Sequence, residues 1–234
     1  YIGEVIKKKD RLVVQTPEDM RERFNIDVRV KSEVTRILPA EKKVEVYDIS
    51  SGKTYSESYD KLILSPGAEP IRLPLPGAES PRIFTIRNIP DTYRIKEFVD
   101  ENRPERALVI GAGFIGLEIA ENLYQRGIKV TIVELADHVI ASLDYDMAAL
   151  VHQHLKSKKI EFYLKDSVKS FNHTENGIIA ELSSGRKLRT DMVVMGIGVR
   201  PETKLAMEAG LRLGPTGGIY VDENMLTSDP DIYA

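Results

Sequence analysis

Residues 107–134 read ALVIGAGFIGLEIAENLYQRGIKVTIVE, and this stretch decides the fold. The apolar residues 107–110 predict a buried strand, and residues 114–126 predict an amphipathic helix that Gly127 ends. Residues 129–133 predict the next strand, which completes a βαβ unit of about thirty residues. The inner side of the helix is expected to carry Ile115, Ile119, Ala120 and Leu123.

The turn between the first strand and the helix has the pattern G-x-G-x-x-G. Gly111 permits the tight turn, Gly113 lets a pyrophosphate approach the backbone, and Gly116 lets the helix pack closely on the sheet. The start of the helix, with Phe114 and Ile115, offers backbone N–H groups and a positive dipole end. The pattern predicts a dinucleotide site, and a glycine-rich turn without a ligand is the other interpretation.

Glu134 ends the second strand, about twenty residues after Gly113, where a carboxylate can accept hydrogen bonds from both ribose hydroxyls. A carboxylate also repels a 2′-phosphate, and residues 135–140 contain no arginine. NADH is therefore favoured, with NADPH possible. A solvated acid at the end of a strand is the alternative interpretation of Glu134.

The residues that follow continue the alternation of strands and helices. A helix is expected near 144–157, a strand near 160–164, a hairpin that turns at Ser184 and Gly185, and a strand at 192–195. This order predicts an α/β, Rossmann-type domain whose mainly parallel sheet is covered on both faces.

The first part of the chain predicts a helix and a small antiparallel β meander. Thr16 can cap a helix that extends to about Phe24, with Pro17 in its first turn and Asp19 completing a capping box. The alternation at Ile26, Val28 and Val30 then predicts a half-buried strand, as does 44–47, and residues 50–53 turn the chain back. Residues 62–64 predict a buried strand.

Residues 66–90 hold six of the twelve prolines, so regular structure is not expected there. This stretch is interpreted as a crossing between two domains. Asp91 is expected to cap a helix that reaches about Asn102.

Composition excludes several classes of function. Of the 234 residues, 42% are hydrophobic and 29% are charged, and the net charge of −3 is well mixed, which gives no support for a nucleic-acid or membrane partner. The chain has no cysteine, so it contains no disulfide, thiolate metal site or cysteine nucleophile. His152 and His154 are two residues apart and diverge on a helix, so no metal is expected.

Both ends of the chain are abrupt. No methionine begins it, and Asp231 to Ala234 after Pro230 begin an apolar run of the kind that becomes a strand. We expect the chain to be an internal piece of a longer protein.

The chain as a whole resembles the FAD-dependent pyridine nucleotide-disulfide oxidoreductases, and above all the branch of coenzyme A-disulfide reductases, NADH-dependent persulfide reductases and NADH oxidases. The segments that carry this resemblance, in order, are LILSPGAEP, FTIRNIPD, VIGAGFIGLEIAENL, IVELADHV, MGIGVRPET and TSDPDIYA.

The resemblance implies a division into domains. Residues 1–90 and 219–234 would be parts of an FAD-binding domain, and 91–218 would be the NAD(P)-binding Rossmann-type domain. It also implies that an N-terminal FAD fingerprint, a redox cysteine and a C-terminal dimerisation domain lie outside this chain. The chain alone is therefore expected to be inactive.

The resemblance also implies roles for individual residues. Phe114 would cover the flavin until nicotinamide displaces it, or be a core aromatic. Glu118 would lie close to flavin and nicotinamide, or be an ordinary helix charge. Gly196 and Gly198 would line the nicotinamide site.

Two further positions carry weaker expectations. The turn Ser65-Pro66-Gly67 would pass near FAD, although Ser and Pro depart from the family's Ala-Thr-Gly, and a plain turn is equally compatible. Arg21 and Arg23 would lie near the phosphates of the substrate, although solvated surface charges are the more common interpretation.

The activity that the resemblance implies is hydride transfer from NADH to FAD, followed by electron transfer to a small-molecule disulfide or persulfide. A cytoplasmic homodimer is expected for the intact protein. The alternatives are an NADH oxidase or ferredoxin-type reductase of the same family, and a nucleotide-binding regulatory module without redox activity.

Overall fold

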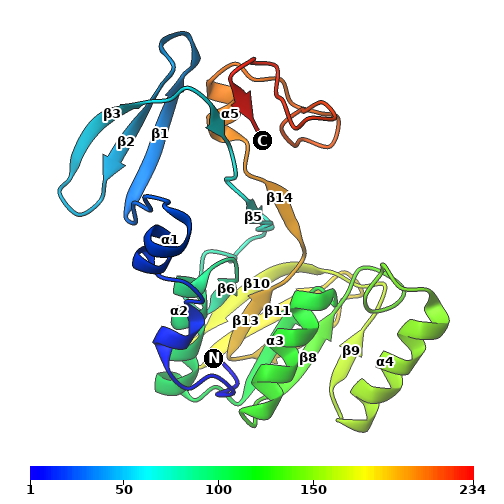
Figure 1. Ribbon diagram of the computed structural model, residues 1–234. Coiled ribbons are helices and arrows are strands. Elements are labelled where there is room, and N and C mark those ends of the chain that lie inside the picture. Colours follow the sequence, from blue (N-terminus) through cyan, green and yellow to red (C-terminus); the bar gives the residue numbers. More distant parts are fainter. The chain divides into compact units, whose positions relative to one another are not determined.

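The computed structural model describes all 234 residues, which divide into two compact units (Figure 1). The first unit contains Tyr1–Leu12 and Pro70–Val199, and the second contains Val13–Glu69 and Arg200–Ala234. These limits differ from the domain boundaries expected after residues 90 and 218. The assignment of either part of the chain to a cofactor stays a prediction.

A five-stranded parallel sheet forms the centre of the first unit, in the order β6-β13-β7-β8-β9. The predicted α/β class with a parallel sheet is confirmed. Two of the predicted strands have the expected limits. The strands are β6 (Ile83–Thr85), β13 (Met192–Met195), β7 (Arg106–Ile110), β8 (Lys129–Val133) and β9 (Glu161–Tyr163).

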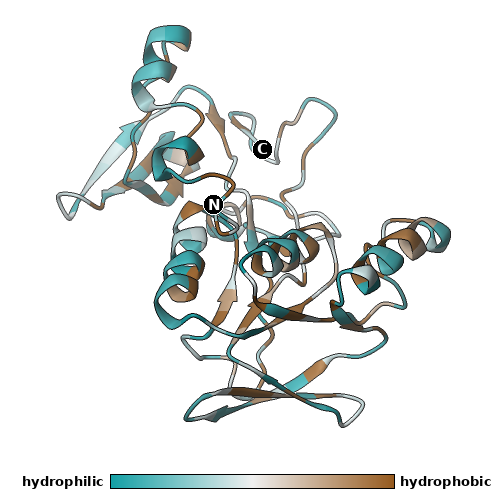
Figure 2. Cartoon of the chain, turned by 90° about the horizontal axis from the view of Figure 1, so that it is seen from below, coloured by the Kyte–Doolittle hydropathy of each residue, from teal (hydrophilic) through white to brown (hydrophobic).

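Alternating side chains of the central strand β7 enter different cores on the two faces of the sheet. Val109 packs in a cluster with residues of three helices, whereas Leu108 and Ile110 pack with an antiparallel meander. The helices are α2 (Ile89–Asn102), α3 (Phe114–Gln125) and α4 (Tyr145–Ser157), and the meander contains β10 (Val168–Thr174), β11 (Gly177–Leu182) and β12 (Lys187–Thr190). Figure 2 shows apolar residues on strands and on parts of the helices, while other parts of the same helices are hydrophilic.

Three local predictions for this unit are wrong. The proline-rich stretch contains β6, because pairing with β13 provides the hydrogen bonds that the local sequence does not signal. Asn88, not Asp91, is the N-cap of α2, and Asp91 is the third helical residue of that capping box. Ile115 is 46% exposed and lines an open pocket at the start of α3 instead of packing in the core.

The second unit contains an antiparallel meander of β1 (Ser32–Leu38), β2 (Lys43–Asp48) and β3 (Lys53–Ser58). Helix α1 (Pro17–Phe24) precedes it, and Thr16 and Asp19 form the predicted capping box. The strand predicted at 26–30 is wrong. That segment has no strand partner and its apolar side chains are exposed, since regular pairing begins only at Ser32.

The two separate segments of the second unit pair with each other. β4 (Leu62–Ile63) lies parallel to β15 (Ile232–Tyr233), so the run that begins at Asp231 does form a short strand. The burial predicted for the strand at residues 62–64 is only partial, because Ile63 is 72% exposed. The remaining elements are the 3₁₀ helices Lys9–Leu12 and Pro39–Glu41, β5 (Ala68–Pro70), β14 (Val199–Pro201), which pairs with β5, and α5 (Lys204–Glu208).

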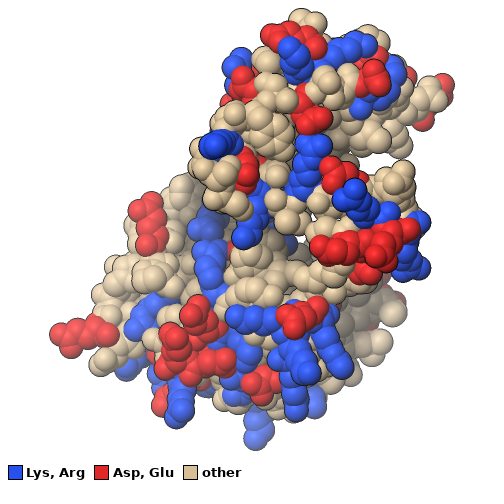
Figure 3. All heavy atoms as spheres, turned by 60° about the vertical axis from the view of Figure 1, so that its left-hand side comes forward, with Lys and Arg blue, Asp and Glu red and all other residues tan.

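The surface carries charges of both signs. Figure 3 shows Lys and Arg interspersed with Asp and Glu over the visible face, with no large field of one sign. None of the helices is both long and apolar enough to cross a membrane.

Candidate nucleotide site

A pocket of about 620 Å³ opens where strands of the parallel sheet end, entirely within the first unit. Ile110 and Gly111 at the end of β7, Val133 at the end of β8 and Gly196 after β13 all line it. Pockets of this size at the carboxyl ends of parallel strands are the usual ligand sites of open α/β sheets.

The three positions of the turn are glycine for different structural reasons. A Cβ on Gly111 would lie 2.4 Å from the carbonyl oxygen of Gly196, and the φ of Gly111 is +95°. A Cβ on Gly116 would lie 2.0 Å from the carbonyl oxygen of Gly111. Gly113 has no neighbour within 4 Å of its Cβ position and lines the pocket. The fold requires the first and third glycines, whereas only an occupant of the pocket would require the second.

Helix α3 begins at this turn with its N-terminus toward the pocket. Gly113 is its N-cap, and no side chain caps the helix. The positive end of the helix dipole is thus offered to the space beside Gly113 and Phe114, which matches the chemistry of a pyrophosphate. The pocket residues therefore fit a dinucleotide.

Glu134 joins the end of β8 to the glycine turn. One carboxylate oxygen accepts a hydrogen bond of 2.6 Å from the Ala112 N–H, and the other accepts one of 2.8 Å from the Ala136 N–H. The carboxylate is therefore held at the pocket wall by two backbone donors rather than being a solvated strand-end acid. Each carboxylate oxygen retains capacity for another donor, such as a ribose hydroxyl.

The loop after Glu134 is attached to the glycine turn by contacts that the sequence did not signal. The Ile140 N–H donates to the carbonyl of Ala112 at 2.8 Å, and the Val139 N–H donates to Nε2 of His152 at 3.2 Å. Burial lowers the pKa of His152, which suits a neutral ring that accepts this bond. Sequence reasoning considered this histidine only as a metal ligand, and no group of three acids or histidines could hold a metal ion.

Asp166 was also missed by sequence reasoning, and it lines the pocket from the segment between β9 and β10. Burial raises the pKa of Asp166, but hydrogen bonds from the Ser183 and Ser184 hydroxyls and from the Ser167 and Ser184 N–H groups lower it to about 2. Nothing local in the sequence marks it, because its partners lie on a hairpin about seventeen residues away.

Gly196 and Gly198 line the other end of the pocket, beside Ile71 and Leu73. The Gly196 N–H donates to the carbonyl of Ile110 at 2.7 Å, and the Ile71 N–H donates to the carbonyl of Gly198 at 3.0 Å. The structure thus brings these two glycines to the same pocket as Gly111 and Glu134.

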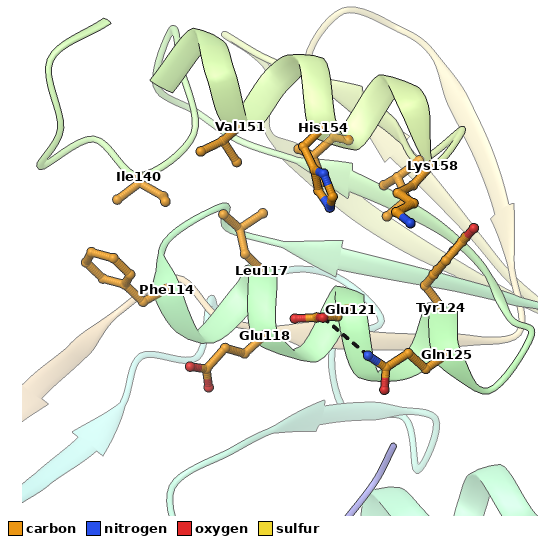
Figure 4. A pocket seen from close by; sticks show the side chains of 12 residues that line it. Phe114, Leu117, Glu118, Glu121, Tyr124, Gln125, Ile140, Val151, His154 and Lys158 are labelled. Atoms are coloured by element: carbon orange, nitrogen blue, oxygen red, sulfur yellow. Dashed lines mark hydrogen bonds between the residues drawn. The ribbon is translucent and has the colours of Figure 1, made fainter. Parts of the chain in front are cut away.

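Phe114 is 63% exposed at the start of α3, so it is not a core aromatic. It lines both the nucleotide pocket and a second pocket of about 330 Å³ between α3 and α4. Figure 4 shows Phe114 at the end of this groove, Leu117 directed toward Val151, and Glu118 directed away from α4. The flavin-related roles of Phe114 and Glu118 stay predictions.

The remaining predicted residues belong to the second unit. Ser65, Pro66 and Gly67 follow β4, and the carbonyl of Gly67 accepts a 3.0 Å hydrogen bond from the Glu202 N–H. Arg21 and Arg23 are exposed on α1. Their roles toward FAD and substrate also stay predictions.

Comparison with known proteins places the chain in a family. Residues 3–234 match the model of the pyridine nucleotide-disulphide oxidoreductase family. Coenzyme A disulfide reductase of Staphylococcus aureus (strain JH9) is 36% identical over 233 residues, which are 100% of this chain and 52% of that protein. The chain thus spans about half the length of the curated relatives that it matches.

Two solved structures share the fold over the full length of the chain. Reduced CoADR-RHD of Bacillus anthracis has a TM-score of 0.96 at 49% identity, and the match covers 42% of that chain. An NAD-dependent persulfide reductase from A. fulgidus has a TM-score of 0.93 at 34% identity, over 44% of that chain. These findings confirm the resemblance that the sequence segments indicated.

Proposed function

This chain belongs to the pyridine nucleotide-disulphide oxidoreductase family, and on that basis we propose that it is the NADH-binding portion of a flavoprotein disulfide reductase. The observation that carries the proposal is the pocket beside Gly113, where the one glycine of the turn that the fold does not need faces open space at a helix N-terminus.

Each end of the pocket has a role in this proposal. The turn from Gly111 to Gly116, with the N–H groups around Phe114 and Ile115, holds the pyrophosphate. Glu134 orients the adenosine ribose by accepting its hydroxyl hydrogens. Gly196 and Gly198 hold the nicotinamide end against the backbone, where side chains would obstruct it.

Bound NADH supplies a hydride and bound FAD accepts it in the intact protein. Phe114, exposed at the mouth of the pocket, shields the flavin side from water until the nicotinamide enters, and Glu118 lies one helical turn further along α3. Ser65 to Gly67 contribute to the FAD side, and Arg21 and Arg23 contact phosphate groups of the substrate.

The acceptor is a small-molecule disulfide or persulfide, by analogy with the coenzyme A disulfide reductase and the persulfide reductase that the chain resembles. Because the 234 residues contain no cysteine, they cannot carry out thiol–disulfide exchange by themselves. We expect the chain to bind NADH without turnover, and the intact protein to be a cytoplasmic homodimer.

Titration of the chain with NADH tests the proposal. Gly113→Val should weaken NADH binding about tenfold to a hundredfold, because its side chain takes the space of the pyrophosphate while the protein fold is unaffected. Gly214→Val is the matched control, since Gly214 has no close contact at its Cβ position and lies outside the pocket. Equal NADH affinities for wild type and Gly113→Val would contradict the assignment.

A further inference from the structure

Asp166 places a second carboxylate in the wall of the nucleotide pocket. One of its oxygens accepts hydrogen bonds from the Ser183 hydroxyl at 2.5 Å, the Ser167 N–H at 2.9 Å and the Ser184 N–H at 3.1 Å. The other oxygen accepts one from the Ser184 hydroxyl at 2.6 Å. Asp166 is only 6% exposed, so its orientation is fixed by these donors.

None of these partners is a cation, so the negative charge of Asp166 is not neutralised by an ion pair. The neutral donors hold the pKa well below neutrality, and the group is ionised at physiological pH. Glu134 and Asp166 are the only charged residues among those that line the pocket, and no lysine or arginine lines it.

Asp166 lies at the Glu134 end of the pocket. The Asp166 N–H donates to the carbonyl of Glu134 at 3.1 Å, which makes the two residues neighbours on adjacent strand ends. The glycines Gly196 and Gly198 belong to the β13 side of the pocket instead. Asp166 is therefore placed toward the adenosine ribose and away from the nicotinamide.

Resting on the proposed NADH site, we propose that Asp166 is a second specificity-determining residue, which acts with Glu134 to disfavour the 2′-phosphate of NADPH. A 2′-phosphate brings about two negative charges to this end of the pocket, whereas the 2′-hydroxyl of NADH brings none. Repulsion between buried like charges decays slowly with distance, so Asp166 acts without touching the phosphate.

The proposal has a consequence for the choice between cofactors. Replacement of Glu134 alone leaves one fixed anion in the wall, so the variant should still prefer NADH. Only removal of both charges should bring the affinities for NADH and NADPH close together.

A structural role is the competing explanation, since Asp166 also ties the segment after β9 to the β11–β12 hairpin. Asp166→Asn removes the charge and keeps an acceptor for the three bonds to Ser183, Ser167 and Ser184. Ser184→Ala keeps the charge and removes the 2.6 Å bond. The two variants therefore separate charge from packing.

The experiment measures dissociation constants of the 234-residue chain for NADH and NADPH at low salt, where electrostatic differences are largest. Asp166→Asn should improve the NADPH-to-NADH affinity ratio about threefold to tenfold at low salt, with NADH affinity little changed. Ser184→Ala should leave the ratio at the wild-type value, and Glu134→Gln combined with Asp166→Asn should exceed either single variant.

An unchanged ratio in folded Asp166→Asn would overturn the proposal. If Asp166→Asn does not fold, the affinity ratio of Glu134→Gln decides instead. A Glu134→Gln variant that still prefers NADH supports the remaining anion, and equal affinities for NADH and NADPH contradict it. If wild type binds neither nucleotide, the proposed function itself fails, which is a distinct result.

Discussion

The two units of the molecule differ in how they bury apolar side chains. In the first unit, both faces of the parallel sheet are covered, and Val109, Ile132 and Val193 are fully buried. In the second unit, one small core gathers around β1 and β2, while Ile63 and Val30 remain 72% and 63% exposed. An apolar strand residue contributes to stability only where a second layer covers it.

The largest predicted difference in stability between the two units comes from replacing one isoleucine in a strand of each unit. Ile132→Ala in β8 should lower the free energy of unfolding by about 3–4 kcal/mol, because it leaves a cavity between the sheet and the helices. Ile63→Ala in β4 should change it by less than about 0.5 kcal/mol. Urea denaturation followed by circular dichroism measures both. Similar losses for the two variants would show that the units do not differ in this way.

The same difference explains how much could be predicted from the sequence. The βαβ unit from β7 to β8 was predictable because its strands, helix and glycine turn follow one another with their own periodicity. Residues 26–30 alternate apolar and polar side chains as a strand does, but no neighbouring strand pairs with them. In contrast, β6 pairs with β13, a partner that the sequence of β6 does not reveal.

The residues of the candidate site also differ in whether a local sequence motif or only the fold identifies them. Gly111, Gly113, Gly116 and Glu134 were predictable because they belong to one local motif with a fixed spacing. Asp166 became recognisable only when the fold placed it in the pocket wall and against the β11–β12 hairpin. A carboxylate whose partners are distant serines has no sequence signature, whereas a turn that needs glycine has one.

A second, smaller contrast concerns the carboxylates of the two units. The pKa of Asp166 in the folded first unit is about 2, below its usual value of 3.8. Its stabilising contribution, about 2 kcal/mol, should therefore be present above pH 4 and be lost as the pH falls to 2. In the second unit, ion pairs with Lys42 and Lys61 lower the pKa of Asp231, and these pairs are partly exposed.

Measurements of unfolding against pH and salt distinguish these two carboxylates. Asp166→Asn should be less stable than wild type at pH 7, and the difference should shrink between pH 4 and pH 2 but change little with salt. The difference for Asp231→Asn should shrink in about 1 M salt, because exposed ion pairs are screened. If the stability difference between wild type and Asp166→Asn fell strongly with salt, the carboxylate would be exposed to solvent, which would contradict the buried hydrogen-bond network.

The smallest predicted effect compares two capping boxes of the same geometry. Thr16 accepts a hydrogen bond from the Asp19 N–H at 3.2 Å, and Asn88 accepts one from the Asp91 N–H at 3.0 Å. Helix α1 buries no residue, whereas α2 buries Ile95 and Val99 in the main core. The two caps therefore differ in what their helices hold together.

Asn88→Ala should lower the free energy of unfolding of the first unit by about 1 kcal/mol, since α2 unfolds together with the core that it covers. Thr16→Ala should leave global unfolding nearly unchanged and instead speed amide hydrogen exchange within α1, because an uncovered helix opens locally. Hydrogen exchange resolved by peptide, together with urea denaturation, measures both responses. If Thr16→Ala lowered global stability as much as Asn88→Ala, α1 would be held by tertiary contacts, and the second unit would be more cohesive than its burial indicates.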